Sequence, residues 1–432
     1  MKNRKALALI AILALVAAAC GGSDGGSDEA VVEVETTEAP ATTEAPTTTA
    51  APAPASDPLI LASLMPLSGD LASLGPGIAL GAALAVEQIN AAGGINGQPV
   101  QLIEGDSGCD GAVALTSLND VIAQGAQGVM GAACSGTALA ILDTAIAAEV
   151  VMVSPSNTSP QFTKIDKKGF YARTAPSDLL QGDVLASLLV EDGVQTVSII
   201  SRADSYGRGL AEATAAAFEA AGGKVKTIVY HATDASEFTS EVTAVGKGGA
   251  DAIVGILFPE TGCGVLQPAF EQGLLDTPWY MTDGVKDAGL ASLCGLGTAL
   301  DGFKGTAPGS AAGEAKDAFE AAYAEVSADG SPTFIFAPQA YDAVMLMAIS
   351  AAANGVTGPE IASGLVAASS GGEKCIGVAC IALAADGVDV DYVGASGEIE
   401  LNAVGDPTAA TYDIWTTEGD TNPVLKSVDF GS

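Results

Sequence analysis

Apolar runs of strand length alternate with longer alanine-rich segments along most of the chain after residue 58. Behind the first run, Ile78, Ala82 and Ile89 recur at the spacing of a buried helix face. Gly93-Gly94-Ile-Asn-Gly97 then predicts the end of this helix. The pattern predicts strands at 59–65, 100–104 and 128–130, and helices around 78–89 and 110–123. This βαβαβ order is typical of a doubly wound parallel sheet in an α/β protein.

A second set of the same kind follows residue 177. It comprises predicted helices at 179–191 and 210–221, one running to 245 and one to 272, and strands at 197–200, 225–230, 252–257 and 279–281. Two α/β units in one chain imply two lobes, with a cleft where the carboxyl ends of their strands face each other.

The remaining chain adds to lobes already begun. Residues 304–308 repeat the Thr-Ala-Pro of the earlier crossing at 174–176. Helices are predicted at 314–326, 338–353 and 358–368, and terminal strands at 394–401 and 410–415. We therefore expect lobe 1 to comprise residues 58–174 and 309–393, and lobe 2 residues 175–308 and 394–432. A chain that crosses more than once makes a multi-strand hinge, suited to closure around a ligand.

The amino terminus predicts export. Lys2, Arg4 and Lys5 precede an apolar run that is too short to span a bilayer and ends in Leu15-Val-Ala-Ala-Ala-Cys20. Small residues before a cysteine look like a bacterial lipoprotein signal of residues 1–19, with Cys20 as the lipid-bearing residue; an ordinary secretory signal is the alternative. Residues 20–57 are rich in Thr, Pro, Ala and acidic residues, which predicts a disordered tether at a membrane surface.

Charge and cysteine content narrow the function. The 432 residues include 52 Asp and Glu but only 17 Lys and Arg, and the net charge of −35 argues against nucleic acid or anionic lipid as a partner. Cys20 aside, six cysteines in an exported chain suggest three disulfides, with fifteen conceivable pairings. Proximity favours Cys109–Cys134, Cys263–Cys294 and Cys375–Cys380. Zinc is the rival interpretation, but His231 is the single histidine, so we expect no metal.

Candidate chemistry concentrates at 129–163, where two apolar runs each end in a turn rich in small hydroxyl residues. Ser135 follows the first run, and Ser156 and Thr158 follow the second. If each turn opens a helix, unpaired N–H groups at adjacent strand ends make a pocket for a small anion such as a carboxylate. The alternative is that these residues are ordinary helix N-caps with no ligand.

Taken together, the motifs resemble the substrate-binding proteins of branched-chain amino-acid ABC transporters, of the type I periplasmic binding protein fold. The resemblance covers about 59–415 and rests on Pro66-Leu-Ser-Gly69, Gly81 to Asn90 with Gly93 to Gly97, Cys109-Asp110, Cys134-Ser135, Ser154-Pro-Ser156 with Thr158, and Tyr206-Gly207. It implies that Ser135 and Thr158 bind a ligand α-carboxylate, and that the Ser156 carbonyl and the Asp283 side chain accept its α-ammonium. It also implies that Leu74, Tyr206 and Phe258 line the pocket and that Cys109–Cys134 is a family disulfide.

Two positions depart from the family pattern. The family commonly has Glu near Asp283 and an aromatic residue where Leu74 stands, so the reach to the ammonium is shorter and the pocket wider. From the residues alone, Asp283 could instead cap a helix through 290–293, and Tyr206 could be a packing residue. No Lys or Arg stands in the candidate turns, which favours a neutral, largely apolar amino acid.

The sequence thus predicts a lipid-anchored, monomeric solute-binding protein that delivers an amino acid to an ABC permease and needs no cofactor. An enzyme is disfavoured, because His231 is expected on an exposed loop and no Gly-x-x-x-x-Gly-Lys phosphate loop occurs. A ligand-sensing module for a signalling partner, or a binding protein for an amide, urea or an aromatic acid, remain the alternatives.

Overall fold

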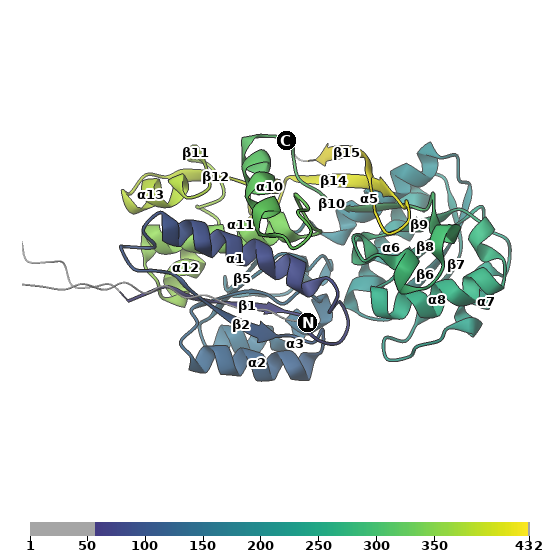
Figure 1. The fold of residues 1–432 in the computed structure, drawn as a ribbon, viewed down its shortest axis with the longest axis horizontal. Helices are drawn as coiled ribbons and strands as arrows, with labels where there is room; N and C mark the ends of the chain where they lie inside the picture. Colours follow the sequence, from purple (N-terminus) through teal and green to yellow (C-terminus); the bar gives the residue numbers. More distant parts are fainter. Residues whose placement is uncertain (1–56, 431–432) are drawn as a thin grey trace, which may run out of the picture. The chain divides into compact units, whose positions relative to one another are not determined.

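The computed structural model describes residues 57–430; the expected signal segment, Cys20 and almost all of the tether lie outside the described residues. The first lobe is built on five parallel strands in the order β2-β1-β3-β4-β5 (Figure 1). The strands are β1 (Ile60–Met65), β2 (Gln101–Asp106), β3 (Gly128–Gly131), β4 (Val151–Ser154) and β5 (Tyr171–Arg173).

Helices cover both faces of this sheet because its strands are apolar on both sides. Leu64 packs toward α2 (Gly111–Ala123) and α3 (Ser135–Ala147), whereas its neighbour Met65 packs with the helices of the other face. That face carries α1 (Gly75–Ala91), α11 (Ala337–Asn354) and α12 (Gly358–Gly364) (Figure 1). The lobe also contains α4 (Gln161–Lys164), α10 (Glu314–Val326), α13 (Ala379–Ala385) and a small sheet of β11 (Glu373–Ile376), β12 (Val390–Gly394) and β13 (Gly397–Glu398).

The second lobe holds a seven-stranded sheet in the order β15-β14-β10-β9-β8-β6-β7. Strand β14 runs antiparallel to its neighbours β10 and β15, and the other pairs are parallel. Its strands are β6 (Thr196–Arg202), β7 (Lys224–His231), β8 (Ala252–Ile256), β9 (Trp279–Met281), β10 (Lys304–Pro308), β14 (Ala410–Thr416) and β15 (Val424–Phe430). Its α-helices are α5 (Asp178–Glu191), α6 (Ser205–Ala220), α7 (Thr239–Gly246), α8 (Pro259–Glu271) and α9 (Leu290–Leu293).

Three connections join the lobes: β5 to α5, β10 to α10, and β13 to β14. Backbone hydrogen bonds hold them together: Arg173 N, at the end of β5, donates to the Gly405 carbonyl of the third connection at 2.9 Å, and Gly309 N of the second connection donates to the Thr411 carbonyl of β14 at 2.8 Å. A joint of three linked connections restricts the lobes to a hinge-like opening.

Several predicted elements differ from the structure. The strand expected at 394–401 shrinks to β13, because the carboxylate of Asp342 accepts the N–H groups of Ala395 and Ser396 at 2.7 and 2.9 Å and so removes them from any ladder. The helix expected at 358–368 ends at Gly364, and β11, β12, α13 and β15 were not predicted.

The prediction that His231 is exposed on a loop is wrong. The residue ends β7, is fully buried, and its ring lies 4.5 Å from that of Phe238. Burial lowers the pKa of His231, so the imidazole is favoured in its neutral form.

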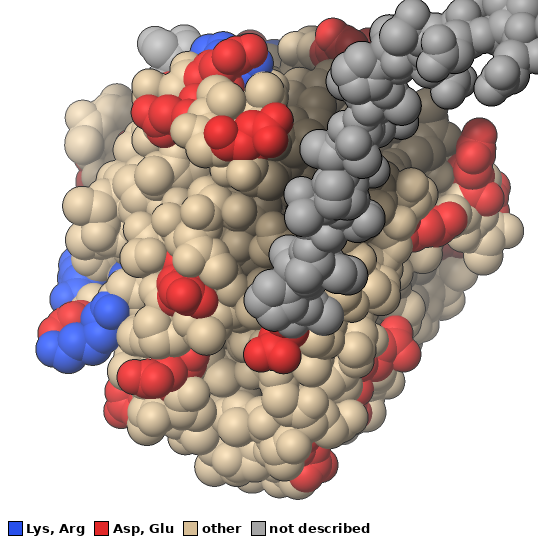
Figure 2. Space-filling model, turned by 90° about the vertical axis from the view of Figure 1, so that its left-hand side faces the viewer, with Lys and Arg blue, Asp and Glu red and all other residues tan. Residues whose placement is uncertain are grey.

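The acidic excess of the sequence is visible at the surface. On the face shown in Figure 2, Asp and Glu side chains recur across the molecule, whereas Lys and Arg gather in few places. Within the described residues, no helix is both long and apolar enough to cross a bilayer.

The structure contains the three disulfides favoured by proximity: Cys109–Cys134, Cys263–Cys294 and Cys375–Cys380. The first links the loop after β2 to the residue that precedes α3, with its cysteines 25 positions apart in sequence, whereas those of the third are 5 apart.

Replacing both Cys109 and Cys134 by Ala is expected to lower the free energy of unfolding by about 3 kcal/mol, because an unfolded chain without this loop closure gains more entropy. Urea denaturation of the oxidised protein measures the loss. The matched double replacement of Cys375 and Cys380 opens a shorter loop and should cost about 2 kcal/mol. An equal or larger loss for the second pair would contradict the loop-closure argument.

Candidate functional site

A small cavity lies between the lobes, at the carboxyl ends of strands from both sheets. The first lobe contributes Leu71, Leu74, Ile78, Ala133, Cys134, Ser135, Ser156 and Phe336, and the second contributes Tyr206, Phe258, Asp283 and Gly284. The lining therefore includes every predicted ligand residue except Thr158.

On the first-lobe side, the cavity faces the start of α3. Cys134 is the N-cap residue and makes no side-chain cap, so the hydroxyl of Ser135 is not the cap of this helix. Ser135 Oγ accepts a long hydrogen bond of 3.4 Å from Ser159 N, which ties the start of α3 to the turn after β4. The first N–H groups of a 13-residue helix lack intrahelical acceptors and carry partial positive charge, so this end of the cavity suits an anion.

The turn after β4 departs from the prediction of a second strand-to-helix junction. No helix begins until Gln161, because Pro160 disfavours helical backbone in the residue that precedes it. The helix that follows, α4, has only four residues. Ser156 is therefore not a helix cap; its hydroxyl donates to the Ala133 carbonyl at 3.2 Å. Ser154 stabilises the turn instead, with its hydroxyl accepting from Ser156 N at 3.3 Å and Asn157 N at 3.1 Å.

Thr158 lies behind the cavity, fully buried, and not in its wall. Its carbonyl accepts a 2.8 Å hydrogen bond from Asp178 N, at the start of α5 in the other lobe. Its hydroxyl makes no hydrogen bond of ordinary geometry, although it is close enough to Asp178 to lower the pKa of that carboxyl in part.

Asp283 provides the acidic group of the second lobe. It is 4% exposed, and its Oδ1 accepts from Gln181 Nε2 at 2.7 Å and from the Tyr206 hydroxyl at 2.9 Å. No described residue donates to Oδ2, which leaves that oxygen for a ligand donor. Burial raises the pKa of Asp283 to about 6, and the bonds from Gln181 and Tyr206 oppose this rise.

This geometry bears on two alternatives drawn from the sequence. Asp283 begins a short 3-10 turn, Asp283–Val285, and its side chain contacts Gln181 and Tyr206 in place of capping α9. Tyr206 is a packing residue and also a hydrogen-bond donor: its ring stacks on that of Phe258 with the centroids 5.3 Å apart, and its hydroxyl donates to Asp283.

A second buried carboxylate, Asp178, was not predicted. It is fully buried, and neither of its oxygens makes a hydrogen bond of ordinary geometry. Burial, and then the nearby charge of Asp283, raise the pKa of Asp178 well above its usual range. In the sequence it looks like an ordinary acidic residue in the first turn of a helix, so only its burial beside Asp283 distinguishes it.

Neither carboxylate forms a direct ion pair with a Lys or Arg of the described residues, although the charge of Arg173 lowers the pKa of Asp178 in part. A buried anion without a partner is costly and favours either protonation or a bound cation. With the positive end of α3 across the cavity, the arrangement can accept a molecule that carries an anion at one end and a cation at the other.

The rest of the wall is apolar. Leu71, Leu74, Ile78, Phe258 and Phe336 are all buried and line the same cavity. Of these, Leu71, Ile78 and Phe336 were not predicted to line the site, because only the folded chain brings the loop after β1, the start of α1 and the residue before α11 together.

Gly284, also unpredicted, has a steric role in this wall. A Cβ on this residue would lie 2.5 Å from the Leu257 carbonyl oxygen and 2.8 Å from the ring of Phe258. Glycine therefore allows the turn after β9 to pack directly beneath the aromatic wall.

The described residues contain no group of three or more His, Cys, Asp or Glu side chains placed to hold a metal ion. The buried His231 has no hydrogen bond at Nε2, and its Nδ1 contacts its neighbour's carbonyl, Ala232 O, at 2.8 Å.

A sequence model of the family described as Periplasmic binding protein matches residues 58–374, and the chain belongs to this family. Its members are extracytoplasmic binding proteins and not enzymes, and the two-lobed α/β fold predicted from the sequence is confirmed.

Individual relatives agree with this assignment. An amino acid binding protein of Pseudomonas aeruginosa is 34% identical over 238 residues, which are 53% of this chain and 62% of that protein, so the match spans less than two thirds of it. The leucine-, isoleucine-, valine-, threonine-, and alanine-binding protein of the same organism is 29% identical over 68% of this chain and 78% of its own length. A leucine binding protein of Thermotoga maritima shares the fold, with a TM-score of 0.73, 20% identity and coverage of 86% of this chain and 98% of that one.

Proposed function

We propose that this protein captures a neutral, apolar amino acid between its lobes and delivers it to an ABC permease. One observation carries the proposal: a buried carboxylate with a free oxygen, Asp283, shares an apolar-walled cavity with the start of α3. A zwitterion matches these two ends, and a closed cavity that excludes water strengthens both interactions.

In this proposal the α-ammonium binds Asp283 Oδ2, with Asp178 and the Ser156 carbonyl nearby, and the α-carboxylate binds the Ser135 hydroxyl and the first N–H groups of α3. In this arrangement Thr158 does not contact the ligand; its carbonyl positions Asp178 through the backbone hydrogen bond from Asp178 N. The ligand side chain packs against Leu74, Phe258 and Phe336, which favours leucine, isoleucine or valine over polar amino acids. No Lys or Arg lines the cavity, so a second carboxylate on the ligand is disfavoured.

The remaining parts of the proposal concern the chain as a whole. Cys20 carries a lipid, residues 20–57 tether the body to the outer face of the cytoplasmic membrane, and the protein acts as a monomer. The lobes comprise residues 58–174 with 309–393 and 175–308 with 394–432. The names of the relatives, which are amino acid binding proteins, support the ligand class.

A thermal-shift screen tests the ligand. The protein is first unfolded and refolded to remove any carried-over ligand, and is then scanned with the amino acids, short amides, urea and benzoate. Leucine, isoleucine or valine at 100 times the dissociation constant should stabilise the fold by about 2.7 kcal/mol. Glutamate and lysine serve as charged controls and should give no shift. Stabilisation by an amide or an aromatic acid, and by no amino acid, would refute the proposed ligand.

A further inference from the structure

Two charged side chains of the second lobe contact one loop of the first lobe, outside the ligand cavity. Arg202 lies at the end of β6, is 2% exposed, and its Nη2 donates to Asp70 Oδ2 at 2.7 Å across the lobe boundary. Glu260, at the start of α8, accepts a 3.0 Å hydrogen bond from Leu71 N. Asp70 and Leu71 belong to the loop after β1, which also supplies cavity residues.

Besides its contact with Asp70, Arg202 is held by three contacts within its own lobe. Its Nε donates to Asp204 at 2.8 Å, its Nη1 donates to Thr261 at 3.1 Å, and its guanidinium lies 3.9 Å from the centre of the Phe258 ring. The same side chain therefore supports the aromatic wall of the cavity from outside and pairs with the opposite lobe.

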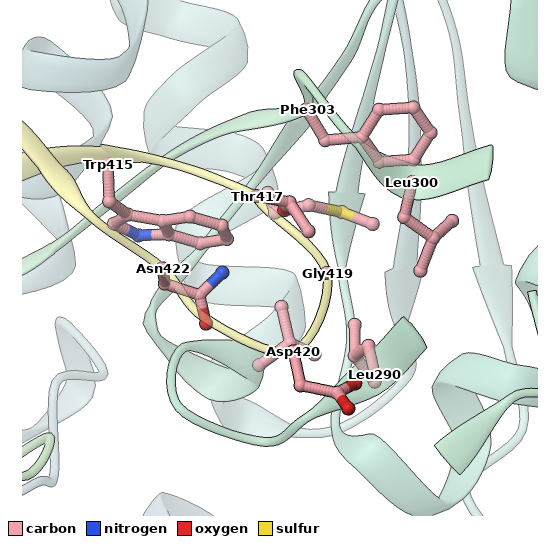
Figure 3. A pocket seen from close by; sticks show the side chains of 10 residues that line it. Leu290, Leu300, Phe303, Trp415, Thr417, Gly419, Asp420 and Asn422 are labelled. Atoms are coloured by element: carbon pink, nitrogen blue, oxygen red, sulfur yellow. The ribbon is translucent and has the colours of Figure 1, made fainter. Parts of the chain in front are cut away.

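A third contact of the same kind lies at another part of the boundary. Asp287, which follows the turn after β9, accepts a 2.9 Å hydrogen bond from Ile335 N, next to the cavity residue Phe336. Asn422, from the loop between β14 and β15 seen in Figure 3, accepts from Asp287 N at 2.9 Å and holds it in place. That loop packs over a small separate cavity, lined by Trp415 and Leu300, inside the second lobe (Figure 3).

The three contacts share a design. Each joins a charged side chain of the second lobe to a first-lobe segment that lines the cavity. At two of them the segment includes a non-glycine residue in the left-handed region, Leu71 at φ 62° and Phe336 at φ 61°. Such backbone is unfavourable and persists where surrounding contacts hold it.

We propose that Arg202, Glu260 and Asp287 form a closure clasp, which holds the lobes together through Asp70, Leu71 N and Ile335 N and sets how long a ligand stays bound. These contacts form between protein groups only, so they favour the form seen here, in which both lobes meet around the cavity and which we take as the closed form, whatever ligand occupies the cavity. A contact present only in the closed form slows opening and hence ligand release, while the encounter of ligand with the open form is unaffected.

Dissociation of radiolabelled L-leucine, chased with unlabelled L-leucine, tests the clasp in the intact protein. Asp70→Ala, Glu260→Ala and Asp287→Gly each remove one contact, and glycine tolerates the left-handed backbone of Asp287, whose φ is 62°. Each variant should raise the dissociation rate constant about three- to fivefold, and the triple variant about 30-fold or more, with an unchanged association rate constant.

Asp192→Asn is the matched control. Asp192 forms a 2.7 Å ion pair with Lys304 inside the second lobe and is 22% exposed, against 2.7 Å and 24% for Asp70. It should leave the dissociation rate unchanged. A folded triple variant that releases L-leucine at the wild-type rate would overturn the clasp, as would an equal effect of Asp192→Asn.

The inference rests on the proposed function only for the choice of L-leucine as the probe. Amide hydrogen exchange of the ligand-free protein gives a second readout, which needs no ligand. Peptides containing Leu71 and Ile335 should exchange faster in Glu260→Ala and Asp287→Gly respectively, and peptides of α7 should not change. If L-leucine does not bind the wild type, the proposed function fails, and unchanged exchange at both peptides separately overturns the clasp.

Discussion

Replacing Asp283 by asparagine is expected to weaken the binding of L-leucine by about 100-fold or more while leaving the fold intact. The carboxylate is the acidic group of the cavity wall, and its Oδ2 has no donor within the described chain. Loss of a charge-assisted bond inside a closed cavity leaves the ligand ammonium buried without a counter-ion, which costs about 3–5 kcal/mol. Isothermal titration calorimetry at pH 7.5 measures the change.

The same variant should make the ligand-free protein more stable at neutral pH. Burial raises the pKa of Asp283 to about 6, against a usual value of 3.8. The folded protein therefore binds a proton more readily than the unfolded chain, so this group costs stability as the pH rises from about 4 to 6 and costs about 3 kcal/mol above pH 6. Asparagine removes that cost, and urea denaturation at pH 5 and 7.5 should show a weaker pH dependence for the variant.

Asp342 provides a matched control in the first lobe. Burial raises its pKa to about 6 as well, but its carboxylate accepts from the Tyr392 hydroxyl, Ala395 N and Ser396 N near the hinge, away from the cavity. Asp283 accepts through Oδ1 alone, which asparagine retains, whereas both oxygens of Asp342 accept hydrogen bonds. Asp342→Asn therefore places an amide NH2 against N–H or O–H donors, so it should lower stability despite the removed charge and leave affinity unchanged. Unchanged affinity in Asp283→Asn would remove Asp283 from the ligand site.

The order of strands and helices in each lobe could be predicted because it follows from local sequence patterns. Strands buried on both faces appear as short continuous apolar runs, and α10 was predicted with the bounds that it has, Glu314–Val326. The sequence is less informative where tertiary contacts decide. The stretch at 394–401 has strand-like residues, yet Asp342, far away in the chain, takes the N–H groups that a strand would use.

The site was predictable to the extent that motifs mark it. The resemblance located Ser135, Tyr206 and Asp283, all of which line the cavity. Phe336 was missed because an aromatic residue at the start of a buried helix looks like core, and only the approach of α11 to the loops after β1 and β9 brings it to the cavity. Asp178 was missed because its sequence signal is that of a common helix start, and only its burial near Asp283 distinguishes it.

Arg173→Met is expected to lower the free energy of unfolding by about 3–5 kcal/mol, a large share of the stability of a typical domain. Arg173 is fully buried at the end of β5; its Nε donates to Asp406 at 2.9 Å and its Nη1 donates to the carbonyls of Asn157 and Ser159 at 3.0 Å each. Methionine fills the space but leaves Asp406 and both carbonyls without these donors. Because the two carbonyls belong to the turn after β4, the affinity for L-leucine should fall as well, measured at a temperature where the variant is folded.

Lys167→Met is the comparison that shows how much a positive charge near Asp406 contributes without a hydrogen bond. Lys167 is 5% exposed and its Nζ lies 3.6 Å from the same Asp406 oxygen, yet it makes no hydrogen bond, so its loss should change stability by less than about 1 kcal/mol. The pH dependence provides a second check. Burial alone would raise the pKa of Asp406, but Arg173 and Thr163 hold it below its usual value, so this carboxylate stabilises the wild type above about pH 4 and less so below. The stability difference between Arg173→Met and wild type should therefore shrink as the pH falls below about 4; a difference that stays constant from pH 5 to pH 3 would show that packing, and not the buried ion pair, holds the turn after β4 in place.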